Sequence, residues 1–211
     1  GFHFVCLDYY GNVFTFGSNE CGQLGIGVDI TYKFCAQKVN LPSCTQVSCG
    51  GFFTICLAED GEIYSFGSNE YGQLGPEKFE QYYPFRTLTS LKDVEFFECG
   101  RLHTFCKTLN NEIYCWGNNN YGQLGLGNYN NQITPILCSS LSNEDIVDIK
   151  CASWYTLVLT SNQHVLSCGN NGCGQIGRKL DNEYSSPSFQ KIEELSEIIR
   201  IECGGDHSMC I

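Results

Sequence analysis

The sequence predicts an all-β fold, a β-propeller built from four-stranded antiparallel blades. Two observations carry this prediction: a motif that recurs at spacings of 50, 50 and 52 residues, and short runs of alternating β-branched and aromatic residues between turn residues. The 211 residues hold about four such periods. A single domain of this length can bury a sizeable core.

The first repeated signature is a glycine-rich segment that contains one glutamine. Its copies are Gly17–Gly25, Gly67–Gly75, Gly117–Gly125 and Gly169–Gly177. Its glycines permit positive φ or close backbone approach, and the glutamine amide can satisfy backbone groups that would otherwise be buried unpaired. We interpret these glutamines as equivalent structural residues: Gln23, Gln73, Gln123 and Gln175. A phosphate-binding loop does not fit, because no GxGxxG or GxxxxGK[ST] segment precedes a helical pattern.

The strands come from the rest of each period. A second signature begins at Cys49, Cys99, Cys151 and Cys203, and residues 1–4 form the tail of a fifth copy. Runs such as 54–57 and 63–66 flank Asp60-Gly61, which predicts a tight hairpin with positive φ at both central residues. Runs such as 34–39 and 46–49 add two more strands, so we interpret one period as one blade.

The order of these motifs is typical of a known family. The combination of G-x-N-x-x-G-Q-L-G, C-G-x-x-H-T and Y-x-W-G, whose fullest copy is Tyr114 to Gly117, resembles the regulator of chromosome condensation repeat. The resemblance implies a seven-bladed propeller, which at roughly 51 residues per blade needs more than about 350 residues. A closed four-bladed ring is the alternative, but residues 205–211 duplicate residues 1–7 and would have no place in it.

We therefore expect one partial propeller over residues 1–211, an open arc from a larger ring. The expected repeats are about 1–50, 51–100, 101–152 and 153–204, with the start of a fifth at 205–211. Because the chain opens inside a predicted strand without Met, we expect a piece of a longer polypeptide with other domains in the same chain.

The cysteines follow the repeat. Eight of the fifteen occupy two repeat positions: Cys49, Cys99, Cys151 and Cys203 in one, and Cys6, Cys56, Cys106 and Cys210 in the other. Equivalent positions lie a blade width apart, which is too far for a disulfide. Val158 takes the second position in one repeat, so the site suits a small apolar side chain. We predict free structural thiols and an intracellular location, cytoplasmic rather than nuclear.

Charge and spacing exclude several kinds of partner and site. Twelve Lys and Arg against 23 Asp and Glu give a net charge of −11, which argues against nucleic acid or an anionic membrane as partner. His and Cys lie three apart at 3–6, 103–106 and 207–210, but residues i and i+3 of a strand point to opposite faces. We predict no metal site, no cofactor and no catalytic residues, because no nucleophile and base are paired in the sequence.

Candidate binding residues are those that differ between repeats at equivalent loop positions. The first set is the pair before each repeated Thr or Ser: Phe2, His3, Phe52, Phe53, Leu102, His103, Trp154, Tyr155, Asp206 and His207. The second set is aromatic and follows the glycine-rich segments: Tyr32, Phe79, Tyr82, Tyr83, Tyr129 and Tyr184. Aromatic residues without a repeated role are candidates for partner contact, and packing between neighbouring loops is the alternative.

Three functions stay open. We favour a non-enzymatic protein-interaction scaffold inside a larger intracellular protein, with a protein partner. The alternatives are a guanine-nucleotide exchange factor for a small GTPase such as Ran, and the recognition domain of a HECT-type ubiquitin ligase. The resemblance implies that the family's founding exchange factor meets Ran through acidic and histidine residues of the first set. Only Asp206-His207 matches that chemistry here.

Overall fold

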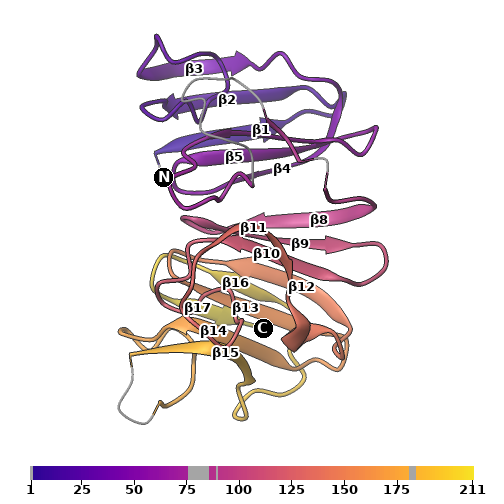
Figure 1. Cartoon of the computed structure of the whole chain (residues 1–211), viewed down its shortest axis with the longest axis vertical. Coiled ribbons are helices and arrows are strands. Elements are labelled where there is room, and N and C mark those ends of the chain that lie inside the picture. Colours follow the sequence, from indigo (N-terminus) through magenta and orange to yellow (C-terminus); the bar gives the residue numbers. More distant parts are fainter. Residues whose placement is uncertain (1, 76–85, 89, 181–183) are drawn as a thin grey trace.

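The computed structural model describes residues 2–75, 86–88, 90–180 and 184–211, and its sheets are antiparallel throughout (Figure 1). The first sheet contains β1 (His3–Leu7), β2 (Val13–Ser18) and β3 (Tyr32–Lys38). The second contains β4 (Cys44–Cys49), β5 (Phe53–Ala58), β6 (Ile63–Gly67) and β7 (Arg86–Thr87). The third contains β8 (Val94–Cys99), β9 (His103–Thr108), β10 (Ile113–Gly117) and β11 (Gln132–Leu137).

The remaining elements complete the arc. The fourth sheet contains β12 (Ile146–Cys151), β13 (Tyr155–Thr160), β14 (Val165–Asn170) and β15 (Ser185–Lys191). The last contains β16 (Ile201–Cys203) and β17 (Ser208–Cys210). A short 3-10 helix, η1 (Ser139–Leu141), precedes β12. The described segments include no helix with the length and apolarity needed to span a membrane. The predicted all-β propeller architecture of about four blades is confirmed.

Each blade after the first begins one strand earlier than the sequence repeat. Neighbouring sheets meet along β4, β8, β12 and β16, which form the inner edge of the arc. In the second blade β4 is the inner strand, yet its residues end the repeat predicted at 1–50. The sheets are therefore offset by one strand from the expected repeats. Three complete four-stranded blades lie between a three-stranded and a two-stranded sheet.

The hairpin turns between the second and third strands differ from the prediction. In the second blade only Gly61 has positive φ, at 84°, and Asp60 does not. The Gly61 N–H donates to the Ala58 carbonyl and the Ala58 N–H donates to the Glu62 carbonyl. This is a type I turn followed by a left-handed residue, a longer hairpin loop than the two-residue turn expected. Asn111 and Gln163, both at φ 62°, hold the left-handed position in the next two blades.

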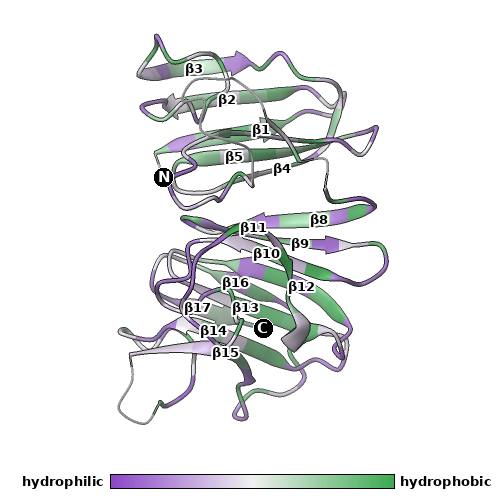
Figure 2. Cartoon of the chain, in the orientation of Figure 1, coloured by the Kyte–Doolittle hydropathy of each residue, from purple (hydrophilic) through white to green (hydrophobic). Residues whose placement is uncertain are grey.

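The core lies between the blades rather than inside one sheet. Every residue of β5 and of β13 is buried, because each middle blade packs on a neighbour at both faces. Phe53 and Phe97 join Trp116 in one such interface, and Phe105 and Val158 lie in the next. In Figure 2, which colours the ribbon by hydropathy, the apolar colour is most continuous in the middle of β13, at Leu157 to Leu159. Burial on both faces explains why strands such as 155–160 read as nearly continuous apolar runs.

The glycine-rich segments are held by the side chains of two residues. The Oε1 atom of Gln123 accepts from the Tyr121 N–H at 3.0 Å, and its Nε2 donates to Asn118 Oδ1 at 2.8 Å. The side-chain oxygens of all four glutamines accept an equivalent backbone N–H. Asn119, which the sequence argument did not single out, accepts from the Leu124 N–H at 2.9 Å. Its Nδ2 donates to two carbonyls of the following loop.

Removing one of these amides tests its structural role. Gln123→Ala should lower the free energy of unfolding by about 1 to 2 kcal/mol, because the part-buried Tyr121 N–H loses its acceptor and the buried Asn118 Oδ1 keeps only the Asn120 N–H. Urea unfolding measures this change. Gln37→Ala is the matched control, since the Gln37 amide bonds only to the adjacent Lys38 carbonyl. Equal stability of the two variants would contradict the structural role.

Candidate functional site

In each blade after the first, a loop connects the inner strand to the second strand. These loops lie together on one face of the propeller arc. Each begins at the residue after the repeated cysteine, which is a glycine in every loop except the one at Ala152. In two of these loops the glycine leaves room for the first side chain of the next strand. A Cβ on Gly100 would lie 2.1 Å from His103 Cε1 and 2.7 Å from the Ala152 carbonyl oxygen. A Cβ on Gly50 would lie 2.0 Å from Phe53 Cε1. The glycine is therefore required by close packing at these two positions.

Backbone hydrogen bonds join these loops to one another. The Gly51 N–H donates to the Arg101 carbonyl at 2.9 Å, and the Arg101 N–H donates to the Ala152 carbonyl at 3.1 Å. Three blades thus share one rim, and a side chain on any of the three loops has a fixed position relative to the other two. We call these loops, residues 50–52, 100–102 and 152–154, the rim.

The second member of four of the predicted pairs is buried between blades. His3, Phe53, His103 and Tyr155 begin strands, and their side chains are at most 4% exposed. A strand that packs on neighbours at both faces has no solvent side at this position. These four side chains therefore present no surface to a partner in this arrangement. His207, the fifth of the group, is exposed.

The buried histidines belong to hydrogen-bond chains between blades. Thr156 Oγ1 donates to the Gln123 carbonyl at 2.8 Å, and His103 Nε2 lies 3.1 Å from the same Oγ1. Because the Thr156 hydroxyl has one proton, His103 must donate through Nε2. Burial lowers the pKa of His103 to about 3, so the imidazole is neutral near pH 7. His3 and Thr54 repeat the arrangement at 3.0 Å.

Tyr155 takes the histidine's place in the fourth blade. Its hydroxyl donates to the His207 carbonyl and contacts Ser208 Oγ at 3.2 Å. Ser208 Oγ donates to the Gln175 carbonyl at 2.6 Å, as Thr156 does one blade earlier. The second position of each pair thus serves blade-to-blade packing with either a histidine or an aromatic residue.

The first members of the pairs lie at the surface, with one exception. Phe2 is 84% exposed, Phe52 and Trp154 are half-buried, and Asp206 is exposed. Leu102 is buried, because Arg101 rather than Leu102 extends from its loop into solvent. The predicted surface set is thus reduced to Phe2, Phe52, Trp154, Asp206 and His207.

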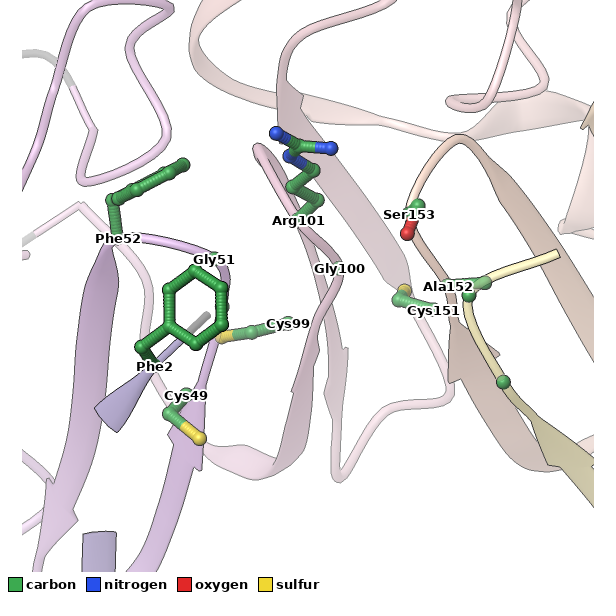
Figure 3. A pocket seen from close by; sticks show the side chains of 13 residues that line it. Phe2, Cys49, Gly51, Phe52, Cys99, Gly100, Arg101, Cys151, Ala152 and Ser153 are labelled. Atoms are coloured by element: carbon green, nitrogen blue, oxygen red, sulfur yellow. The ribbon is translucent and has the colours of Figure 1, made fainter. Parts of the chain in front are cut away.

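The rim surrounds a pocket of about 450 Å³. It is lined by Phe2, Cys49, Gly50, Gly51, Phe52, Cys99, Gly100, Arg101, Cys151, Ala152, Ser153, Gly204 and Gly205. Figure 3 shows Phe2 and Phe52 at one side, Ser153 at the other, and Arg101 between them. Cys99 and Cys151 lie deeper on the inner strands, where burial raises the pKa of both thiols and keeps them neutral.

Arg101 is the residue that sequence reasoning missed. Its guanidinium carbon lies 6.0 Å from the centre of the Phe52 ring and 5.1 Å from the centre of the Trp154 ring. Tyr121, from a glycine-rich segment, packs on the other side of Trp154 with ring centres 5.4 Å apart. At the position of Arg101 the other repeats have Gly51, Ser153 and Gly205. A single charged residue among small ones is the sequence feature that could have identified Arg101.

The second aromatic set lies elsewhere. Tyr32, Tyr129 and Tyr184 are 59%, 43% and 82% exposed and precede or begin the outer strands. None of the three lines the rim pocket. Phe79, Tyr82 and Tyr83 fall outside the described residues. The two sets therefore do not form one surface among the residues described.

The fifteen cysteines are free thiols in this structure. Cys56 and Cys106 are fully buried between blades, and Val158 is buried at the equivalent position. This burial agrees with the predicted packing role. Among the described residues, no three His, Cys, Asp or Glu side chains are arranged to hold a metal ion.

Comparison with known proteins places this fold in context. A human RCC1-like G exchanging factor-like protein is 35% identical over 68 residues, which are 30% of this chain and 15% of that protein. Human HERC3, described as a probable E3 ubiquitin-protein ligase, is 32% identical over 86 residues, which are 40% of this chain and 8% of that protein. The matches thus span a small share of these relatives.

Solved structures share the fold over nearly the whole chain. Human WBSCR16 superposes with a TM-score of 0.86 at 22% identity, covering 96% of this chain and 56% of that one. Prp20p of Saccharomyces cerevisiae, whose binding to Gsp1p and histones was described with its structure, gives 0.85 at 22% identity, covering 99% and 53%. The chain spans about half the length of these structures.

The match to one family extends over residues 1–211, described as an RCC1-like domain. It agrees with the repeated motifs and with the antiparallel blades. The chain therefore belongs to the RCC1-like domain family.

Proposed function

We propose that this chain is a non-enzymatic protein-interaction module that holds a protein partner against its rim. The observation that carries the proposal is the row formed by Phe52, Arg101, Trp154 and Tyr121, which comes from three blades and flanks the rim pocket. Arginine and large aromatic residues are the side chains most enriched at the energetic centres of protein interfaces.

The pattern of repetition supports the same conclusion. Residues that bond one blade to the next recur from repeat to repeat, as Gln123 and Thr156 do. The first residue of each pair varies among the repeats, from Phe in two of them to Leu, Trp and Asp in the others, so the fold does not require its identity. Variation on a repeated scaffold is how propellers acquire individual partners.

The proposal is tested by replacing two rim aromatics together. Phe52→Ala with Trp154→Ala should weaken binding of the native partner at least about tenfold, which corresponds to about 1.4 kcal/mol. The partner is first identified by affinity capture, and its Kd is then measured by calorimetry. The blades should stay folded, because neither side chain lies in the buried core.

A matched control lies at the other end of the strands. Tyr9 and Tyr10 are 97% and 78% exposed in the turn after β1, and their rings are in contact. Tyr9→Ala with Tyr10→Ala also removes two aromatic side chains from the surface and should leave the Kd unchanged. If only the Tyr9 and Tyr10 variant lost binding, the partner would bind the face opposite the rim, and the proposal would be wrong.

Nucleotide exchange on a small GTPase is a second candidate, favoured by the exposed Asp206 and His207. Such activity would stabilise the nucleotide-free GTPase and would need no covalent chemistry. We expect this protein not to accelerate nucleotide release from Ran, because Phe52, Leu102 and Trp154 stand where the family resemblance implies acidic and histidine side chains. Strong acceleration by the full-length protein would replace the scaffold proposal.

A further inference from the structure

The guanidinium of Arg101 is oriented by two rings. Phe52 and Trp154 lie on either side, at 6.0 and 5.1 Å from the guanidinium carbon to the ring centres. Rings that contact a guanidinium restrict its rotation while its N–H groups remain available at its edge. Arg101 is itself exposed. The side chain is therefore positioned before any partner arrives.

Arg101 differs from the other two arginines whose side-chain contacts the structure describes. Arg178 donates to Ser167, Gln190 and Ser188, and Arg200 forms an ion pair with Glu202 at 2.7 Å. Among the described residues, no side-chain hydrogen bond or ion pair involves the Arg101 guanidinium. The difference indicates that its donors are available to a group from another molecule.

The charge around Arg101 is also unusual for this protein. The chain has a net charge of −11, yet Arg101 is the only charged residue among those that line the rim pocket. Cys49, Cys99 and Cys151 are the titratable groups of that lining, and burial raises the pKa of all three thiols. The residues that line the pocket thus include one cation and no carboxylate, although the charge of Glu98, just outside the lining, acts on all three thiols.

Resting on the proposed function, we propose that the rim binds a carboxylate side chain from an acidic segment of the protein partner. Arg101 pairs with that carboxylate through its fork of N–H groups, and Phe52 and Trp154 hold the fork in place. A carboxylate matches the single positive charge of the pocket. A phosphate monoester carries about −1.5 to −2 and would need a second cation, which the lining does not supply.

The test uses synthetic peptides rather than the native partner. A fluorescein-labelled ten-residue peptide rich in Asp and Glu is titrated with the full-length protein at low salt, and anisotropy gives the Kd. The same peptide with Asn and Gln in place of the acids is the comparison, and a phosphoserine peptide is the third probe. We expect saturable binding of the acidic peptide alone, weakened by added salt.

Variants of arginine assign the effect to one side chain. Arg101→Gln should weaken binding of the acidic peptide at least tenfold, and Arg101→Lys should also weaken it because lysine lacks the planar fork. Arg200→Gln removes the same charge from an exposed arginine that does not line the pocket and should leave the Kd unchanged. Circular dichroism confirms the fold of each variant, and Arg101→Lys keeps the test valid if Arg101→Gln unfolds.

Four results would overturn the proposal. The first is that the acidic peptide shows no saturable binding, and the second is that Arg101→Gln and Arg200→Gln weaken its binding equally. The third is that the phosphoserine peptide binds with a lower Kd than the acidic peptide. The fourth is that the protein self-associates and Arg101→Gln abolishes this self-association. A native partner whose binding depends on Phe52 and Trp154 but not on Arg101 would overturn the carboxylate assignment alone. The interaction face itself would then stand.

Discussion

Trp116→Ala should lower the free energy of unfolding by about 3 to 5 kcal/mol, the range observed when a large buried aromatic residue is removed from a core. Trp116 is 1% exposed and packs in the interface between the second and third blades. Its Nε1 donates to the Gln73 carbonyl at 2.8 Å. The substitution therefore opens a cavity and weakens a contact between blades at the same place.

Trp116→Phe separates these two effects. Phe66 is the natural residue at the equivalent position of the second blade, so a phenyl ring suits this site. The Gln73 carbonyl still accepts from Thr104 Oγ1 at 3.2 Å, so we expect a cost of only about 1 kcal/mol from the lost bond. Urea denaturation followed by circular dichroism measures both variants. A Trp116→Ala protein within 1 kcal/mol of the wild type would argue against this packing.

Acid should destabilise the protein through His103. Burial lowers the pKa of His103 from 6.5 to about 3 in the folded state. Between these values the unfolded chain binds the proton and the folded chain does not, so stability falls as the pH drops below about 6.5. At pH 5 the loss amounts to about 2 kcal/mol, at about 1.4 kcal/mol per pH unit.

A difference measurement isolates this contribution. Glu98 acts in the opposite direction, because burial first, with Asp148 and Glu202 nearby, raises its pKa to about 7 against the effect of Lys150. His103→Phe, which copies Phe53 of the preceding repeat, should therefore lose less stability than the wild type between pH 7.5 and 5. Thermal unfolding at both pH values gives the comparison. Identical pH dependence in the two proteins would show that His103 is not buried in its neutral form.

The fold could be predicted from the repeat because each motif meets a local structural requirement. Gln123 and the glycines of its segment satisfy short-range geometry, and both Gly122 and Gly125 have the positive φ expected of them, at 76° and 67°. The phase of the blades lacks such a local signal. A spacing of about 50 residues is the same wherever counting starts, and only the contact of β4 with β8 shows which strand is the inner one.

The candidate site could be predicted only in part. Variation between repeats is enough to predict Phe52 and Trp154 as surface residues. The same variation wrongly predicts a loop position for Phe53 and Tyr155, which begin strands. The role of Arg101 depends on Phe52, 49 residues earlier, and Trp154, 53 residues later, as the residue numbers give. Such a row exists only after three blades have been placed side by side, so no local pattern reveals it.

The offset between repeat and blade makes each sequence repeat a covalent link between two blades. The repeat at 51–100 supplies β5, β6 and β7 to one sheet and β8 to the next. In a duplicated repeat, the first three strands would pair with the inner strand that already precedes them. The fourth strand would be a new inner strand, and the three strands that follow it in the chain would pair with it. The arc could thus lengthen during evolution by whole repeats without ever leaving a strand unpaired within the new material.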